Sequence, residues 1–257
     1  MNFGELLSWV LWDLTRRRKM IGAIVIVSLP VLLGLIIRIA AGDVPGSSIY
    51  GVVFPLAVQQ FAMAVLCILY GTNIISSEVS GRTISFLVTR PTSRVSIFLA
   101  KYVGSVIFAS IMTIISAILL GFVSFGPAGI ADSPLLRDIM IIPVGVATYT
   151  AVFSCLSALL TRPAIPAIAY VFAFETWVWV VPGDFVKLSI MTYVRTLSLH
   201  DAPGSRQGLA GILAQLREST VTLTASWNAV IFITLIALVV GCYAFSQGEY
   251  VPKEDTT

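Results

Sequence analysis

Charged side chains are scarce in this chain. Only 11% of its 257 residues are charged, whereas 57% are hydrophobic, and the mean hydropathy is +0.94. A soluble globular domain carries about 25% charged residues. The composition therefore excludes an ordinary soluble domain and indicates an integral membrane protein.

The residue types that build catalytic and metal sites are also rare. The chain has 1 histidine, His200, and its 3 cysteines fall in three separate apolar stretches, where a thiol behaves as a small hydrophobe. Metal-ligand spacing of the cysteines, a serine-nucleophile motif and a zinc-binding His-Glu motif are all missing. We therefore expect no catalytic residue, no metal and no cofactor in this chain.

A phosphate-binding loop is missing as well. The pattern Gly-x-x-x-x-Gly-Lys-Ser/Thr does not occur in the sequence. Any ATP-driven role would therefore require an ATPase on a separate chain.

Long apolar runs are abundant. A helix needs roughly 20 apolar residues to cross a hydrocarbon core about 30 Å thick. The sequence therefore predicts an all-α integral membrane protein with a single transmembrane domain over residues 1–257. Its six predicted transmembrane helices span residues 20–41, 51–75, 102–123, 139–160, 164–181 and 227–246.

Residues 1–19 precede the first predicted span and have a different pattern. Apolar residues from Phe3 to Leu14 recur at helical spacing, Trp9 and Trp12 can anchor at a membrane interface, and residues 16–19 are all basic. We expect an amphipathic helix here that lies on the surface of the bilayer.

Basic residues predict the orientation. They are more frequent in residues 16–19, 76–101 and 162 and at the carboxyl end than in the segments between, so both termini are predicted to be cytoplasmic. Residues 182–226 then form an extracytoplasmic loop, with short helices expected at 185–199 and 208–216. The net charge of +3 reflects this topology, and we expect a multi-pass protein of the cell membrane that does not bind nucleic acid.

A few polar side chains fall within the predicted spans. Arg38 and Glu175 are the two charges there, and Gln59 and Gln60 are predicted to lie at a similar depth. Ionisable groups in a bilayer are costly and tend to be functional. Two interpretations stay open: a polar pair or substrate pathway formed by these residues, or an Arg38 that extends to the headgroups and a Glu175 that faces a wet cavity.

The most informative segment is the charged stretch between the second and third predicted spans, residues 76–101. It carries Glu78, Arg82, Arg90, Arg94 and Lys101 among apolar surroundings. Gly81 interrupts the first part, and Pro91 forces a turn because the residue before a proline disfavours the helical region. The pattern predicts a compact helical protrusion on the cytoplasmic side that could bind a soluble partner.

This segment resembles a known family. The order Glu78, Gly81, Arg82-Thr83, Leu87, Arg90-Pro91, Ser93-Arg94 and Lys101 is similar to the first intracellular loop of permease subunits of type-2 ABC exporters. Within that family the resemblance is to the subgroup that includes the permease of nitrous-oxide-reductase maturation. The amphipathic leader, the six spans and the long segment before the last span also fit this architecture.

The resemblance implies a function and partners. The loop would be a coupling helix that docks on a separate ABC ATPase subunit, and two permease chains would form a homodimer or heterodimer with a substrate pathway between them. The residues implied at the ATPase interface are Glu78, Gly81, Arg82, Thr83, Arg90, Pro91 and Arg94. The alternatives are a non-transporting scaffold or mechanotransmission subunit linked to an ATPase, and a polytopic membrane enzyme.

Overall fold

The computed structural model describes residues 3–40, 44–80, 93–130, 133–178, 184–199 and 221–247. Within these ranges the side chains of residues 18, 75–80, 128 and 184 are not described. The described residues form helices and contain no strand, which confirms the predicted all-α class.

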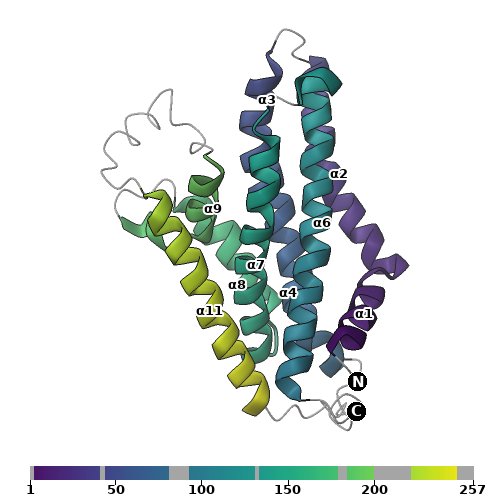
Figure 1. Cartoon of the computed structure of the whole chain (residues 1–257), viewed down its shortest axis with the longest axis vertical. Helices are drawn as coiled ribbons and strands as arrows, with labels where there is room; N and C mark the ends of the chain where they lie inside the picture. Colours follow the sequence, from purple (N-terminus) through teal and green to yellow (C-terminus); the bar gives the residue numbers. More distant parts are fainter. Residues whose placement is uncertain are drawn as a thin grey trace.

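Long helices make up most of the molecule (Figure 1). They are α2 (Arg17–Ala40), the continuous segment of α3 (Gly46–Val53), the π-helical η1 (Phe54–Met63) and α4 (Ala64–Ser80), then α6 (Arg94–Gly129), α7 (Leu135–Leu159) and α11 (Leu223–Gln247). Five apolar segments are long enough to cross a membrane: Lys19–Ala40, Gly46–Ile74, Arg94–Pro127, Leu135–Leu159 and Leu223–Gln247. They correspond to five of the six predicted spans.

The predicted span at 164–181 is different. Its described helical part consists of α8 (Ala164–Ile168), with 5 residues, and the π-helical η2 (Ala169–Glu175), with 7. At a rise of about 1.5 Å per residue such a segment reaches only about 18 Å, short of the roughly 30 Å hydrocarbon core. The buried Glu175 lies at the end of η2, and helical backbone continues through the next two residues before the described part of this segment ends at Val178. The described residues therefore form five full-length apolar helices and a shorter one.

Helix α7 lies at the centre, in contact with α4, α6 and α11 (Figure 1). Glycines allow two of these contacts to be close. A Cβ atom on Gly71 of α4 would lie 2.9 Å from the Cβ of Phe153, and one on Gly241 of α11 would lie 3.3 Å from the Cα of Cys155. Small residues at such positions let helix backbones approach, which is a common basis of helix packing in membranes.

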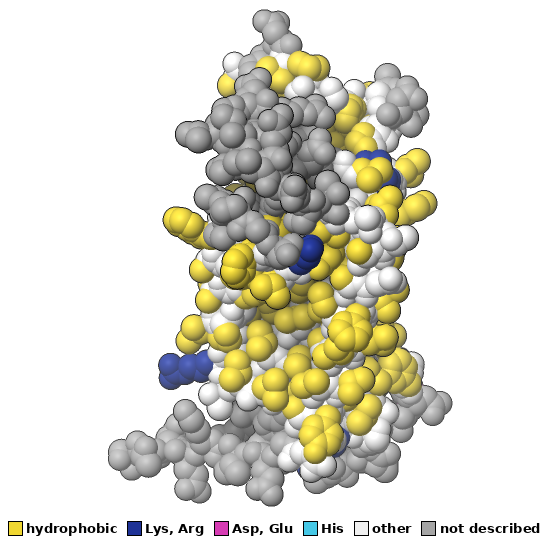
Figure 2. Space-filling model, turned by 90° about the vertical axis from the view of Figure 1, so that its left-hand side faces the viewer, with side chains coloured by type: hydrophobic (Ala, Val, Ile, Leu, Met, Phe, Trp, Pro, Cys, Tyr) yellow, Lys and Arg dark blue, Asp and Glu magenta, His cyan; other side chains and the backbone are white. Residues whose placement is uncertain are grey.

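Helices α2 and α11 lie at the periphery and bury the smallest share of their residues among the five. Figure 2 shows the side that carries α11, where hydrophobic side chains cover most of the described surface. Because lipid tails solvate such side chains, this surface suits a bilayer rather than water. The large exposed apolar residues of α11 include Ile231, Phe232, Leu235, Ile236, Val239 and Val240.

Helix α1 (Phe3–Leu14) confirms the amphipathic helix expected near the amino terminus. Its buried residues are Leu6, Val10 and Leu14, and the helix packs on α6, where Gly104 makes room for Val10. Trp12 on the other face is exposed. One face of α1 is thus bound to the bundle, and the bilayer contact predicted for the other stays a prediction.

The segment between η2 and α11 was expected to be an extracytoplasmic loop with short helices. Residues 184–199 do form helices, η3 (Asp184–Leu188) and α9 (Ile190–Ser198), and the second expected helix at 208–216 lies outside the described residues. Almost every residue of α9 is buried, and α9 packs against α7 and α11. This part of the segment therefore belongs to the interior of the bundle.

Candidate functional site

Most of the residues implied at an ATPase interface lie outside the part of the chain that the structure describes. Those between residues 81 and 92 are Gly81, Arg82, Thr83, Arg90 and Pro91. Glu78 belongs to α4, but its side chain is not described. The described structure does, however, include both helices that lead into and out of this loop.

Helix α6 begins directly after the loop. The backbone N–H of Ser96 donates to the Ser93 hydroxyl at 3.2 Å, which caps the helix as expected for a serine in this position. The next residue, Arg94, donates from Nη1 to the carbonyl oxygen of Ser246 at 3.3 Å. Ser246 lies in the last turn of α11, where carbonyls have no partner within the helix. Arg94 therefore ties the start of α6 to the end of α11.

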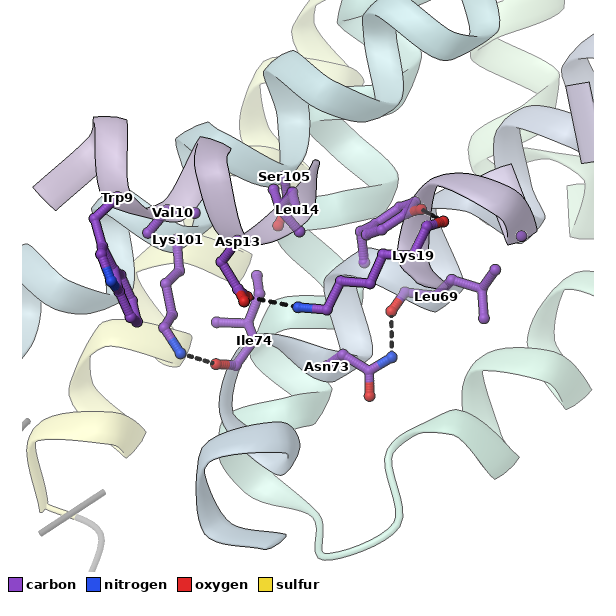
Figure 3. Close-up of a pocket in the computed structure, with 12 residues that line it drawn as sticks. Trp9, Val10, Asp13, Leu14, Lys19, Leu69, Asn73, Ile74, Lys101 and Ser105 are labelled. Carbon is purple, nitrogen blue, oxygen red and sulfur yellow. Dashed lines mark hydrogen bonds and ion pairs between the residues drawn. The ribbon is translucent and has the colours of Figure 1, made fainter. Parts of the chain in front are cut away.

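Lys101 provides a second link, one that joins the two helices flanking the loop. Its Nζ atom donates to the carbonyl oxygen of Ile74 at 2.9 Å, and the side chain is 9% exposed (Figure 3). Ile74 lies in α4, before the loop, and Lys101 lies in α6, after it. The two links together therefore join α6 to α4 and to α11.

A buried polar cluster lies deeper in the bundle and centres on Glu175. Tyr149 of α7 donates its hydroxyl to Oε2 of Glu175 at 2.5 Å, Ser189 donates to Oε1 at 3.3 Å, and the backbone N–H of Met191 donates to Oε1 at 3.2 Å. Glu175 itself has no exposed surface. Met191 is in the first turn of α9, so the carboxylate satisfies an otherwise orphaned donor at the positive end of that helix.

Arg195 extends this cluster from the other end of α9. It is 1% exposed, and its Nη2 atom donates to Oε1 of Gln60 at 2.5 Å and to the carbonyl oxygen of Pro55 at 3.3 Å. Arg195 therefore links α9 to η1 inside the bundle.

Gln59 and Gln60, which the sequence placed within a predicted span, both lie in η1 and face α9. Gln59 donates from Nε2 to the hydroxyl of Ser198 at 3.0 Å, and Gln60 donates to the hydroxyl of Thr176 at 3.5 Å. The two residues follow Pro55 in a π-helical segment, a geometry that often occurs at functional sites. Hydrogen bonds therefore connect the second span, the short helix and α9 in one network.

Arg38 does not join this network. It lies in the last turn of α2 and is exposed, while the hydrogen bonds of Glu175 go to α7 and to the segment around α9. The cation close to Gln60 is Arg195, which the sequence-based topology had assigned to an outer loop. One signal could have identified it: an arginine flanked by Met191, Val194 and Leu197 sits in a helix that is apolar on several sides.

A second buried acid was also not anticipated. Asp138, in the first turn of α7, has no exposed surface and accepts a hydrogen bond at 2.8 Å from the hydroxyl of Tyr50 in α3. The predicted span began at residue 139, one residue later, so this acid was treated as part of a loop. It joins α3 to the start of α7, at the end of the bundle opposite the end of α4 and the start of α6 (Figure 1).

Comparison with protein families decides the class of the protein. A model of a family described as ABC-2 family transporter protein matches residues 14–176, which is more than half of the chain. The chain belongs to the ABC-2 transporter family. No match to a curated protein was found.

Family membership confirms the broad function that the loop suggested. The chain is a multi-pass membrane protein and an ABC-2 permease, a class that is normally a non-catalytic membrane subunit of an ABC transporter. The matched region contains the 76–101 loop, both glutamines and Glu175 and ends directly after that carboxylate. Helix α9 with Arg195, and α11, lie beyond it. The finer resemblance to the nitrous-oxide-reductase-maturation subgroup stays a prediction.

Proposed function

We propose that this ABC-2 permease works with a second permease chain and receives its energy from a separate ABC ATPase subunit that binds the 76–101 loop. The two permease chains, identical or different, enclose the substrate pathway. ATP-driven movement of the ATPase subunits pushes the loop and tilts the helices attached to it.

The observation that carries this proposal is the pair of links beside the loop. Lys101 holds α6 to the carbonyl of Ile74 in α4, and Arg94 holds α6 to the carbonyl of Ser246 in α11. Hydrogen bonds from a cationic donor contribute about 1.5–3 kcal/mol each. Force applied to the loop would therefore reach three long helices at once, as a coupling element requires.

The same end of the molecule is proposed to face the cytoplasm. Helix α1, the start of α6 and the end of α11 lie together at this end (Figure 1). The basic residues Arg16, Arg17 and Lys19 follow α1 directly, and cytoplasmic segments are enriched in such residues. The loop would then be accessible to a soluble ATPase.

An even number of crossings follows from this arrangement. Helix α7 ends at the loop end of the bundle, and α11 ends there too (Figure 1), so the chain between them must rise toward the other end. We propose that α8, η2 and the residues after them supply this sixth crossing, with α9 completing it inside the bundle. Both termini would then lie on the cytoplasmic side of the cell membrane.

Co-purification with a candidate ATPase tests the proposal. The tagged permease would be co-expressed with a candidate ABC ATPase subunit and purified in mild detergent, and bound ATPase and ATP hydrolysis would be measured. We expect Glu78→Lys to reduce the bound ATPase, and Arg94→Ala to preserve binding but weaken the coupling of hydrolysis to the permease. Arg38→Gln, an exposed change at the far end of α2, is the control and should match the unmodified protein.

Two outcomes would contradict the proposal. Absence of any bound ATPase in several detergents would remove the coupling role of the loop. A complex that forms equally well with Glu78→Lys would place the contact elsewhere. A complex that hydrolyses ATP without moving any substrate in liposomes would instead favour the alternative of a mechanotransmission subunit.

A further inference from the structure

A cavity of about 370 Å³ lies between α1, the start of α2, the end of α4 and the first turns of α6 (Figure 3). Pockets for small molecules usually measure roughly 300–1,000 Å³. Its walls are formed by apolar side chains such as Trp9, Leu14 and Leu69, together with a few polar groups. The cavity is separate from the buried cluster around Glu175.

The cavity lies at a membrane boundary. Lys19, on its wall, is the last of four consecutive basic residues before the apolar run of α2, and Ile74, also on its wall, lies just before the polar sequence Ser76-Ser77-Glu78 that follows the apolar run of α4. Two membrane-spanning segments therefore end at the level of this cavity. Phospholipid headgroups and the first carbons of their acyl chains occupy that depth.

Positive charge exceeds negative charge on the walls. Two ammonium groups, those of Lys19 and Lys101, line the cavity together with one carboxylate, that of Asp13. The Lys19 Nζ atom lies 2.6 Å from Oδ2 of Asp13, and their side chains are 40% and 32% exposed, so this ion pair is open to the cavity and to solvent. An ammonium has three donors, and one carboxylate does not use them all.

We propose that this cavity binds the headgroup of an anionic phospholipid from the surrounding bilayer. The phosphate lies near Lys19, and the glycerol and the first acyl carbons lie against Trp9 and Leu69. Basic pockets between membrane helices at the boundary suit such headgroups, because the positive charge is matched and the apolar half of the ligand is covered. The lipid would contact α1, α2, α4 and α6 at once and hold α1 on the bundle.

Neither of the two simpler ligands matches the walls as well. The choline group of a zwitterionic lipid would add a positive charge beside two ammonium groups. Free phosphate would match the charge but leave the apolar walls around Trp9 and Leu69 uncovered. The proposal depends on the membrane location of the chain and not on the coupling to an ATPase, so it can fail or succeed independently of that coupling.

The test uses the purified full-length protein in a neutral detergent. Short-chain phosphatidylglycerol, short-chain phosphatidylcholine and inorganic phosphate are titrated separately while the thermal unfolding temperature is recorded. We expect a saturable rise in the unfolding temperature with phosphatidylglycerol and little change with phosphatidylcholine or inorganic phosphate. An equal rise with phosphatidylcholine or with phosphate alone would overturn the proposal.

Matched charge variants locate the binding. Lys19→Gln should weaken phosphatidylglycerol binding about tenfold, as expected for the loss of one charge-assisted hydrogen bond. Asp13→Asn, which releases Lys19 from its ion pair, should strengthen phosphatidylglycerol binding. Arg17→Gln and Glu5→Gln make the same changes of charge on the same two helices, outside the cavity, and should change the affinity less than twofold.

These two pairs of variants distinguish a specific lipid-binding site from a general effect of surface charge. Equal weakening by Lys19→Gln and Arg17→Gln, or equal strengthening by Asp13→Asn and Glu5→Gln, would mean that no specific site exists. If Lys19→Gln does not fold, the opposite-sign variant Asp13→Asn still tests the proposal, because an unchanged or lower affinity contradicts it.

Discussion

The two polar regions of this permease are built differently. Around Glu175 each carboxylate oxygen accepts hydrogen bonds from groups of the protein, and the cluster has hardly any exposed surface. Beside α1, Asp13 and Lys19 form an ion pair that is partly exposed. In the interior region the protein itself supplies the hydrogen-bond donors of Glu175, whereas the boundary region leaves part of its charge to the surroundings. Stability should therefore depend strongly on the first region and weakly on the second.

The largest effect is expected for Glu175→Ala. The change leaves the Tyr149 hydroxyl, the Ser189 hydroxyl and the Met191 N–H without their acceptor and removes the acidic group near Arg195. Loss of one partner in a buried charged network costs about 3–5 kcal/mol. Thermal unfolding in detergent should show a clear drop, and Glu175→Gln, which retains an acceptor oxygen, should lose less. Equal unfolding temperatures for Glu175→Ala and the unmodified protein would show that the cluster does not stabilise the fold.

The second-largest loss of stability is expected when the Arg195 guanidinium is removed. Arg195→Met keeps the apolar stem but deprives Gln60 Oε1 and the Pro55 carbonyl of their donor, which should cost about 2–4 kcal/mol because the oxygens stay buried. The same thermal unfolding assay in detergent measures this loss of stability. Arg38→Gln is the matched control on an exposed arginine and should change stability by less than about 0.5 kcal/mol. Similar losses for both variants would contradict the interior role of Arg195.

A smaller effect is expected for Tyr149→Phe. Only the hydroxyl is removed, and Glu175 keeps its bonds from Ser189 and Met191, so the loss should be about 1–2 kcal/mol. Tyr243→Phe removes a hydroxyl from an exposed tyrosine of α11 and serves as the control. A Tyr149→Phe protein as stable as the control would mean that this short hydrogen bond contributes little.

The smallest effect should come from the boundary region. Asp13→Asn breaks two partly exposed ion pairs, with Lys19 and with Arg16, and such pairs contribute about 0.2–1 kcal/mol each. The difference should shrink when unfolding is repeated at high ionic strength, since salt screens exposed charges. A loss as large as that of Glu175→Ala, or one insensitive to salt, would remove the contrast between the two regions.

Part of the interior cluster could be predicted from the sequence and part could not. Glu175, Gln59 and Gln60 stand out as polar residues in apolar runs, and the structure brings all three to α9. Their basic neighbour was harder to identify. Arg38 was one candidate for this neighbour because it lies in a long apolar run. A long side chain near a helix end can, however, extend to the membrane surface and needs no partner within the bundle. Arg195 lies in a short helix whose burial depends on the helices around it.

The sequence by itself determined the class of the protein, five of its long apolar helices and the amphipathic helix before them. These features depend on local composition and on helical periodicity, which are readable residue by residue. Only the tertiary structure decided that Glu175 bonds to the first turn of α9, that α9 enters the bundle, and that Arg94 and Lys101 link the helices beside the loop. Each of these depends on a partner far away in the chain, such as Met191, Ile74 or Ser246, and a hydrogen bond over that separation leaves no local pattern in the sequence.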